Sequence, residues 1–148
     1  MHGIVESICY RFFSQHTQGI TMNKPTIDLS KILKAQKTFE RFRKEMTDKD
    51  ITQAGVVQAF EFCYELAWKT MKRFLATQGI DAISPKDTFR KAALAKIIDD
   101  PEVWFDFQEK RNLTAHTYEQ ENLDAIVNIL ENFSTELHKV ITRIKAQI

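Results

Sequence analysis

The sequence predicts an all-α protein, an antiparallel up-and-down bundle of four to five helices. Three observations lead to this expectation. The chain of 148 residues contains only 4 Gly and 3 Pro, too few for a fold built from many tight turns. Apolar residues recur at every third or fourth position over long stretches. Proline directly follows a capping residue at two places where a new helix is expected to begin.

The first helix is expected to begin near Asp28, because apolar residues recur at helical spacing from Leu29 to Met46. The polar run at 47–50 ends this pattern. A second, longer helix carries one broad apolar face from Phe60 to Leu75, and Gly79 provides its stop.

Charged residues lie mostly on the opposite face of the second helix: Glu61, Glu65, Lys69 and Lys72. One interpretation is a solvated face stabilised by pairs four residues apart. The other is that one glutamate lines a pocket that contains Arg111. The sequence leaves both open.

Two short helices follow. Ser84–Asp87 combines a capping serine, a proline in the first turn and an acidic residue three positions after the cap. Asp100–Glu102 repeats this signal for a fourth helix, which leads into Arg111. Phe89 and Leu94 are among the apolar residues of the third helix.

The fifth helix has the most regular pattern, with apolar residues three or four apart from Leu123 to Ile144. Thr117 is expected to cap this helix, with Gln120 as the reciprocal capping residue. The helical path should therefore break between Arg111 and Thr117. The apolar faces exceed what one small bundle is expected to bury, which favours a homodimer.

Composition limits the function classes. The net charge is +1, so binding of nucleic acid would have to come from a local cluster of cations. The 2 cysteines suggest no disulfide framework, which favours a cytoplasmic protein. No apolar run approaches the length of a membrane span. We expect residues 1–21 to be an extension or a poorly ordered arm, with slight strand character at 4–13, and residues 22–148 to form one domain.

The eight residues from Arg111 to Tyr118 carry the strongest functional signal. They combine a guanidinium, the Asn112 amide, the His116 imidazole and a phenol. A guanidinium recognises phosphate through a planar fork of donors, and an imidazole can move a proton at neutral pH. Arg111 and His116 would lie roughly 140° apart on an unbroken helix, so they converge only if the backbone turns between them.

The spacing alone is weak, because Arg11 and His16 repeat it without the flanking Asn and Tyr. Together, FEF-x-YELAWK at 60–69 and RN-x3-H-x-Y at 111–118 resemble the HEPN superfamily. Within it, the chain is most similar to nucleotidyltransferase substrate-binding proteins, relatives of the HepT toxins. The resemblance covers roughly Leu29 to Ile144.

The resemblance implies a helical homodimer that partners a minimal (MNT-type) nucleotidyltransferase, often as a toxin–antitoxin module. It implies that Arg111 and His116 act in metal-independent RNA cleavage, with Asn112 as a polar neighbour, and that the partner can adenylylate Tyr118. For this branch a role in binding nucleotide or RNA, through Arg111, Asn112, Glu65 and Lys69, is the leading expectation.

Two alternatives remain open from the residues. One is an RNase that uses His116 and Arg111; the other is a non-catalytic helical interaction domain in which both side chains satisfy a helix terminus. Trp68 and Trp104 are expected to be packing residues. The 4 histidines are dispersed along the chain and there is no Gly-rich phosphate loop, so we expect no metal site and no cofactor.

Overall fold

The structure, a computed structural model, describes residues 26–148. Within that range the chain forms α-helices, one short 3-10 helix and no strand, which confirms the predicted all-α fold. The elements are α2 (Ser30–Glu45), α3 (Asp50–Thr77), α4 (Pro85–Leu94), α5 (Pro101–Leu113), η1 (Thr114–His116) and α6 (Gln120–Lys145). The predictions for residues 1–21, including the strand signal at 4–13 and the second Arg-to-His spacing, lie outside the described residues.

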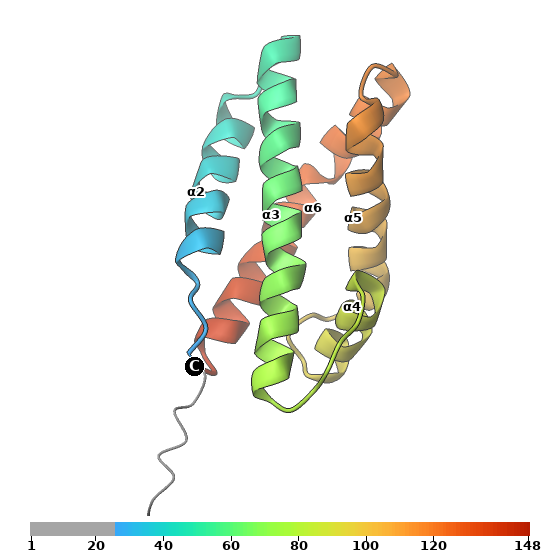
Figure 1. Cartoon of the computed structure of the whole chain (residues 1–148). Coiled ribbons are helices and arrows are strands. Elements are labelled where there is room, and N and C mark those ends of the chain that lie inside the picture. Colours follow the sequence, from blue (N-terminus) through green and yellow to red (C-terminus); the bar gives the residue numbers. More distant parts are fainter. Residues whose placement is uncertain (1–25) are drawn as a thin grey trace, which may run out of the picture.

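The long helices run up and down beside one another (Figure 1). Helix α3 packs against α2, α4, α5 and α6, and α6 crosses behind it. The connection between α2 and α3 lies at the same end of the bundle as the η1 turn. The start of α2 and the end of α6 lie together at the opposite end.

An aromatic cluster fills the core, with Phe133 of α6 at its centre. Its ring lies 5.5 Å from Phe39 of α2, 4.8 Å from Phe60 of α3 and 5.1 Å from Phe107 of α5, measured between centroids. All three contacts are edge-to-face, the arrangement that the charge distribution of aromatic rings favours. One side chain therefore ties together the four long helices.

Helix α3 begins at Asp50, well before the apolar pattern that starts at Phe60. The added turns bury Val56 and Val57, which the apolar face expected from Phe60 to Leu75 did not include. Its end agrees with the prediction. Gly79 has a φ of 76°, and the backbone N–H of Ile80 reaches back to the carbonyl of Leu75 at 2.9 Å.

The predicted caps of α4 and α5 are confirmed. The Ser84 hydroxyl accepts a hydrogen bond from the backbone N–H of Asp87 at 3.2 Å, and the Asp100 carboxylate accepts one from that of Glu102 at 2.9 Å. Leu94, expected among the apolar residues of α4, is 84% exposed because it falls on the outer face of this short helix.

The predicted cap of α6 is wrong. The residue before the helix is Glu119, which forms no side-chain cap, and Gln120 donates to the Asp124 side chain instead. Because Thr114–His116 forms a 3-10 turn, Thr117 keeps a near-helical backbone and cannot adopt the extended conformation of a capping residue. Within residues 26–148, no helix combines the length and apolar character that crossing a membrane requires.

Candidate functional site

The helical path breaks after Leu113, as the sequence predicts. The buried Thr114 shapes this break: its hydroxyl donates to the backbone carbonyl of Arg111 at 2.7 Å and accepts from the Arg111 Nη1 at 3.3 Å. The first bond adds to the one that the Thr114 backbone N–H donates to the same carbonyl, and the second directs the guanidinium. The Arg111 side chain is thus held at the point where α5 passes into η1.

Glu65 of α3 contacts two cations through its carboxylate. Its Oε1 lies 3.6 Å from the Arg111 Nε, and its Oε2 lies 3.7 Å from the Lys69 Nζ. The Trp68 indole N–H also donates to Oε2 at 3.1 Å. The charged face of α3 therefore makes the expected pair four residues apart and also contacts Arg111 on α5.

Several buried polar atoms beside this cluster have no hydrogen-bond partner within residues 26–148. They are the Tyr64 hydroxyl, the Gln108 Oε1 and the Arg111 Nε. Burial raises the pKa of Tyr64 above its usual range, the Glu65 charge raises it further, and the Arg111 charge opposes both. Buried polar groups are normally paired, and ordered water is the usual partner where no protein group serves.

Sequence reasoning missed Tyr64 and Gln108 as candidate site residues. Tyr64 falls on the apolar face of α3, where an aromatic residue is expected to serve the core. Gln108 precedes Arg111 by three residues, so the two share a face of α5. That spacing was the signal that could have identified it.

His116 and Tyr118 form a separate, exposed pair. The His116 Nδ1 lies 3.1 Å from the Tyr118 hydroxyl, and the two rings are roughly perpendicular with centroids 5.8 Å apart. The Asn122 side chain donates to the His116 carbonyl at 3.0 Å and fixes the turn. Tyr118 is 78% exposed, so its hydroxyl is accessible to another protein.

The predicted site residues thus fall into two groups. Arg111, Glu65 and Lys69 are linked by ion pairs, and His116 contacts Tyr118. Within residues 26–148, no hydrogen bond or ion pair joins Arg111 to His116. Asn112 is exposed, and its side chain makes no hydrogen bond in this part of the chain.

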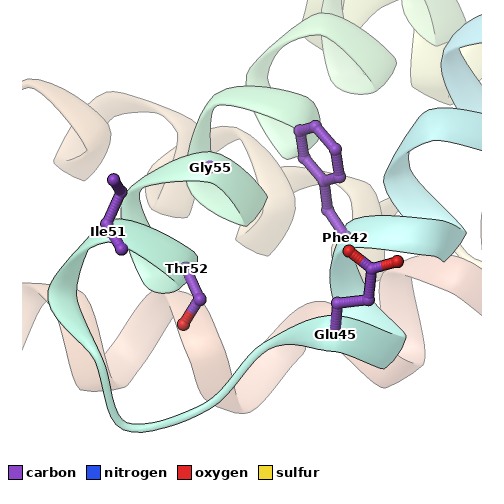
Figure 2. A pocket seen from close by; sticks show the side chains of 5 residues that line it. All are labelled: Phe42, Glu45, Ile51, Thr52 and Gly55. Atoms are coloured by element: carbon purple, nitrogen blue, oxygen red, sulfur yellow. The ribbon is translucent and has the colours of Figure 1, made fainter.

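Two open hollows lie at the end of the bundle near η1. One, of about 420 Å³, lies between the start of α3 and the turn that carries Tyr118, with Asp50 and Leu123 among its lining residues. The other, of about 170 Å³, lies at the α2–α3 connection, where Phe42 and Glu45 face Thr52 and Gly55 (Figure 2). This second hollow contains none of the predicted site residues.

Across the described part of the chain, no three His, Cys, Asp or Glu side chains gather as metal ligands would. The groups capable of chemistry here are thus the guanidinium, the imidazole, the phenol and the Glu65 carboxylate. They can bind a phosphate, transfer a proton and accept a modifying group.

Comparisons with known proteins agree with this fold. The chain is similar to a Haemophilus influenzae protein named "Probable ribonuclease HepT", with 39% identity over 92 residues, 59% of this chain and 63% of that protein. It thus spans less than two thirds of the curated relative it matches. Its fold resembles the crystal structure of a Thermus thermophilus protein, with a TM-score of 0.72, 23% identity and coverage of 76% of this chain and 98% of that one.

A second solved structure, also from Haemophilus influenzae, is described as revealing the fold of a substrate-binding domain of a nucleotidyltransferase. The TM-score is 0.73 at 30% identity, and the match covers 80% of this chain and 99% of that one. The family model described as "Nucleotidyltransferase substrate binding protein like" matches residues 27–146. The match confirms the resemblance inferred from the two motifs. The chain therefore belongs to the family of nucleotidyltransferase substrate-binding-like proteins.

Proposed function

We propose that this protein is the helical partner subunit of a minimal nucleotidyltransferase and binds a nucleotide or RNA substrate for it. The observation that carries the proposal is the Arg111 guanidinium. It is 31% exposed, its Nε faces Glu65 at 3.6 Å, and its Nη1 donates to Thr114, which leaves the other Nη donors for a ligand. A guanidinium fixed in this way retains free donors for a phosphate.

The neighbouring residues have distinct roles in this proposal. Lys69 supplies a second positive charge beside the phosphate, and Glu65 orients both cations. Asn112, exposed one residue after Arg111, donates to the sugar or the base. Tyr118 is the site at which the partner attaches an adenylyl group, because its hydroxyl is exposed. The two proteins then form a toxin–antitoxin module in the cytoplasm.

Purification of the tagged full chain from its source organism tests this proposal. Mass spectrometry of the copurifying proteins is expected to identify a small nucleotidyltransferase, and the two purified proteins should coelute in gel filtration. Elution of the chain alone, even after mixing with every nucleotidyltransferase encoded beside it, would contradict the partnership.

The second candidate function is a metal-independent RNase, favoured by the name of the Haemophilus influenzae relative. A ribose 2′-oxygen would attack the adjacent phosphorus while its proton passes to a base, and the 5′-oxygen would leave with a proton. His116 would take or donate the proton, and Arg111 would stabilise the charge that builds on the phosphoryl oxygens.

This candidate requires a shared cleft, because no direct contact joins Arg111 to His116 within the described chain. A homodimer would bring the His116 of one subunit to the Arg111 of the other. Incubation with total RNA in the presence of a chelator is expected to release fragments from wild-type protein and none from His116→Ala. If the wild-type protein leaves the RNA intact, the RNase candidate is contradicted and only the binding function remains. A monomer in light scattering excludes the shared cleft.

A further inference from the structure

A basic hollow lies on α2 and α3, outside the Arg111–Tyr118 motif. Its volume is about 480 Å³, and its lining residues are Lys31, Leu66, Trp68, Lys69, Lys72 and Arg73. Four of these six carry a positive charge and none carries a negative one. The whole chain has 21 basic and 20 acidic residues, so this concentration is local rather than a consequence of a basic surface.

Some cations elsewhere in the bundle have close carboxylate partners, although others, such as Lys37 and Lys44, have none within 4.0 Å among the described residues. Lys91 pairs with Asp87 at 2.9 Å, and Lys110 pairs with Asp106 at 2.7 Å. In the hollow, by contrast, Lys69 has only the 3.7 Å contact with Glu65. Within residues 26–148, no carboxylate lies within 4.0 Å of the side-chain nitrogens of the other three cations.

In the absence of a bound anion, the positive charges of the hollow repel one another. Lys72 and Arg73 follow Lys69 by three and four residues, so each lies beside Lys69 on the surface of α3 and repels it. Lys31 adds a fourth charge from the first turn of α2. Asp28 lies near enough for the Lys31 and Arg73 charges to help lower its pKa, after the larger effect of hydrogen bonds from Ser30. Asp28 and Glu65 are two carboxylates against the four cations of the hollow, so positive charge remains in excess.

Trp68 indicates which anion fits. Its indole lines the hollow, its N–H is held by Glu65, and the Lys69 Nζ lies 5.9 Å from its ring. Surfaces that bind single-stranded nucleic acid typically combine cations along the phosphate backbone with an aromatic ring on which a base stacks. Trp68 packs against the core, as the sequence predicts, but it stays partly exposed where it lines the hollow, and a base would use that exposed part of the ring whereas an acidic polypeptide would not.

We propose that this hollow binds the backbone phosphates of single-stranded RNA and that a base stacks on Trp68. Glu65 connects this surface to the candidate site, because its two oxygens contact Lys69 and Arg111. A strand held in the hollow would continue to Arg111. The inference rests on the proposed function, since it makes RNA, rather than a free nucleotide, the substrate that Arg111 receives.

The test is fluorescence anisotropy with a labelled oligouridylate of about twelve nucleotides, within the range one such surface covers. Lys72→Gln/Arg73→Gln removes two cations from the hollow. Lys37→Gln/Lys44→Gln removes two exposed cations from α2 and changes the net charge equally. The hollow variant is expected to bind about tenfold more weakly, because charge-assisted contacts are lost. The α2 variant should bind like wild type.

Salt dependence provides an independent readout. Each phosphate contact on a single strand contributes about 0.7 to the slope of log affinity against log salt, so the hollow variant should lose about 1.4. Trp68 provides another. RNA should quench its fluorescence, and the quench should vanish in Trp68→Phe, because Trp104 is fully buried. Equal affinity and equal slope in wild-type and hollow variant would overturn the inference. So would displacement of the RNA by polyglutamate of equal charge at equal concentration.

Arg111→Gln separates this inference from the proposed function. RNA binding that is lost in Arg111→Gln but intact in Lys72→Gln/Arg73→Gln would reject the hollow and leave the proposed function standing. Binding that is lost only in the hollow variant would support the hollow and count against Arg111. Titration of both variants with ATP shows whether the bound phosphates come from a nucleoside triphosphate or from an RNA backbone.

Discussion

The Arg111 guanidinium of α5 and the Glu65 carboxylate of α3 lie 3.6 Å apart, Nε to Oε1, although the two residues are far apart in the sequence. Both side chains are partly exposed, at 31% and 37%. Ion pairs this accessible to water contribute little to stability, typically below about 1 kcal/mol. The pair is therefore better explained by the position it gives the guanidinium than by any gain in stability.

Replacement of Glu65 by glutamine tests that explanation. The amide keeps an acceptor for the Trp68 indole but removes the negative charge that holds the Arg111 guanidinium. We expect RNA to bind severalfold more weakly, because Arg111 loses the partner that positions it, and the free energy of unfolding to change by less than about 1 kcal/mol. Tighter binding by Glu65→Gln would mean that the carboxylate repels the ligand more than it positions Arg111.

Tyr118 is expected to be the adenylylated residue. Its hydroxyl is exposed and lies 3.1 Å from the His116 Nδ1, which can accept the phenolic proton. With the partner nucleotidyltransferase and ATP, intact-protein mass spectrometry should show the addition of one AMP to wild type and none to Tyr118→Phe. Tyr64→Phe is the matched control, because Tyr64 is only 2% exposed and should not be modified. An AMP adduct on Tyr118→Phe would show that another residue is modified and would contradict the assignment to Tyr118.

Phe133 is expected to be the most sensitive position of the core. Phe133→Ala leaves a cavity among the rings of α2, α3 and α5, and such changes typically cost about 3–5 kcal/mol. Urea unfolding followed by circular dichroism measures this loss. Phe62→Ala on α3 provides the control, because Phe62 is 59% exposed and should change stability by less than about 0.5 kcal/mol. Equal losses would contradict the central place of Phe133.

The buried thiol of Cys63 is expected to make the stability of the protein depend on pH. Burial, with a smaller contribution from the Glu40 charge, raises the pKa of its thiol from 9.0 to about 12. The folded state thus disfavours the thiolate, so its contribution to stability is complete below pH 9 and is lost as pH rises toward 12. In a Cys9→Ser background, Ellman's reagent at about pH 8 should react with unfolded but not with folded protein, because only an accessible thiol forms the reactive thiolate. Rapid reaction of the folded protein would refute this.

Local chemistry made much of the fold predictable. The Ser84 and Asp100 caps and the αL conformation of Gly79 depend on neighbouring residues alone, and the apolar period of α6 reflects a single buried face. The start of α3 was missed because its first turn, around Thr52, lacks an apolar stripe. The 3-10 turn at Thr114 depends on its contact with Arg111, which displaced the start of α6 from the predicted cap.

The candidate site was predictable in its residues but not in its pairing. The motif identified Arg111, and the charge pattern of α3 left Glu65 as one of several partners. Which glutamate meets Arg111 depends on how α3 and α5 are rotated about their axes, and that rotation is set by the whole core. The basic hollow was missed for the same reason, because Lys31 joins Lys72 and Arg73 only when α2 packs antiparallel to α3.

The central claim is that Arg111 receives the phosphate of a nucleotide or RNA substrate. Equilibrium binding of ATP and of the oligouridylate to Arg111→Gln, compared with Lys110→Gln, tests it most directly. Lys110 is adjacent in sequence but is paired with Asp106 at 2.7 Å, so the two variants lose the same charge from different environments. We expect the Arg111 variant to lose at least about tenfold in affinity for the true substrate, since charge-assisted bonds disappear, and the Lys110 variant to bind like wild type. Equal affinity in both variants, with the helical content of each unchanged, would contradict the assignment.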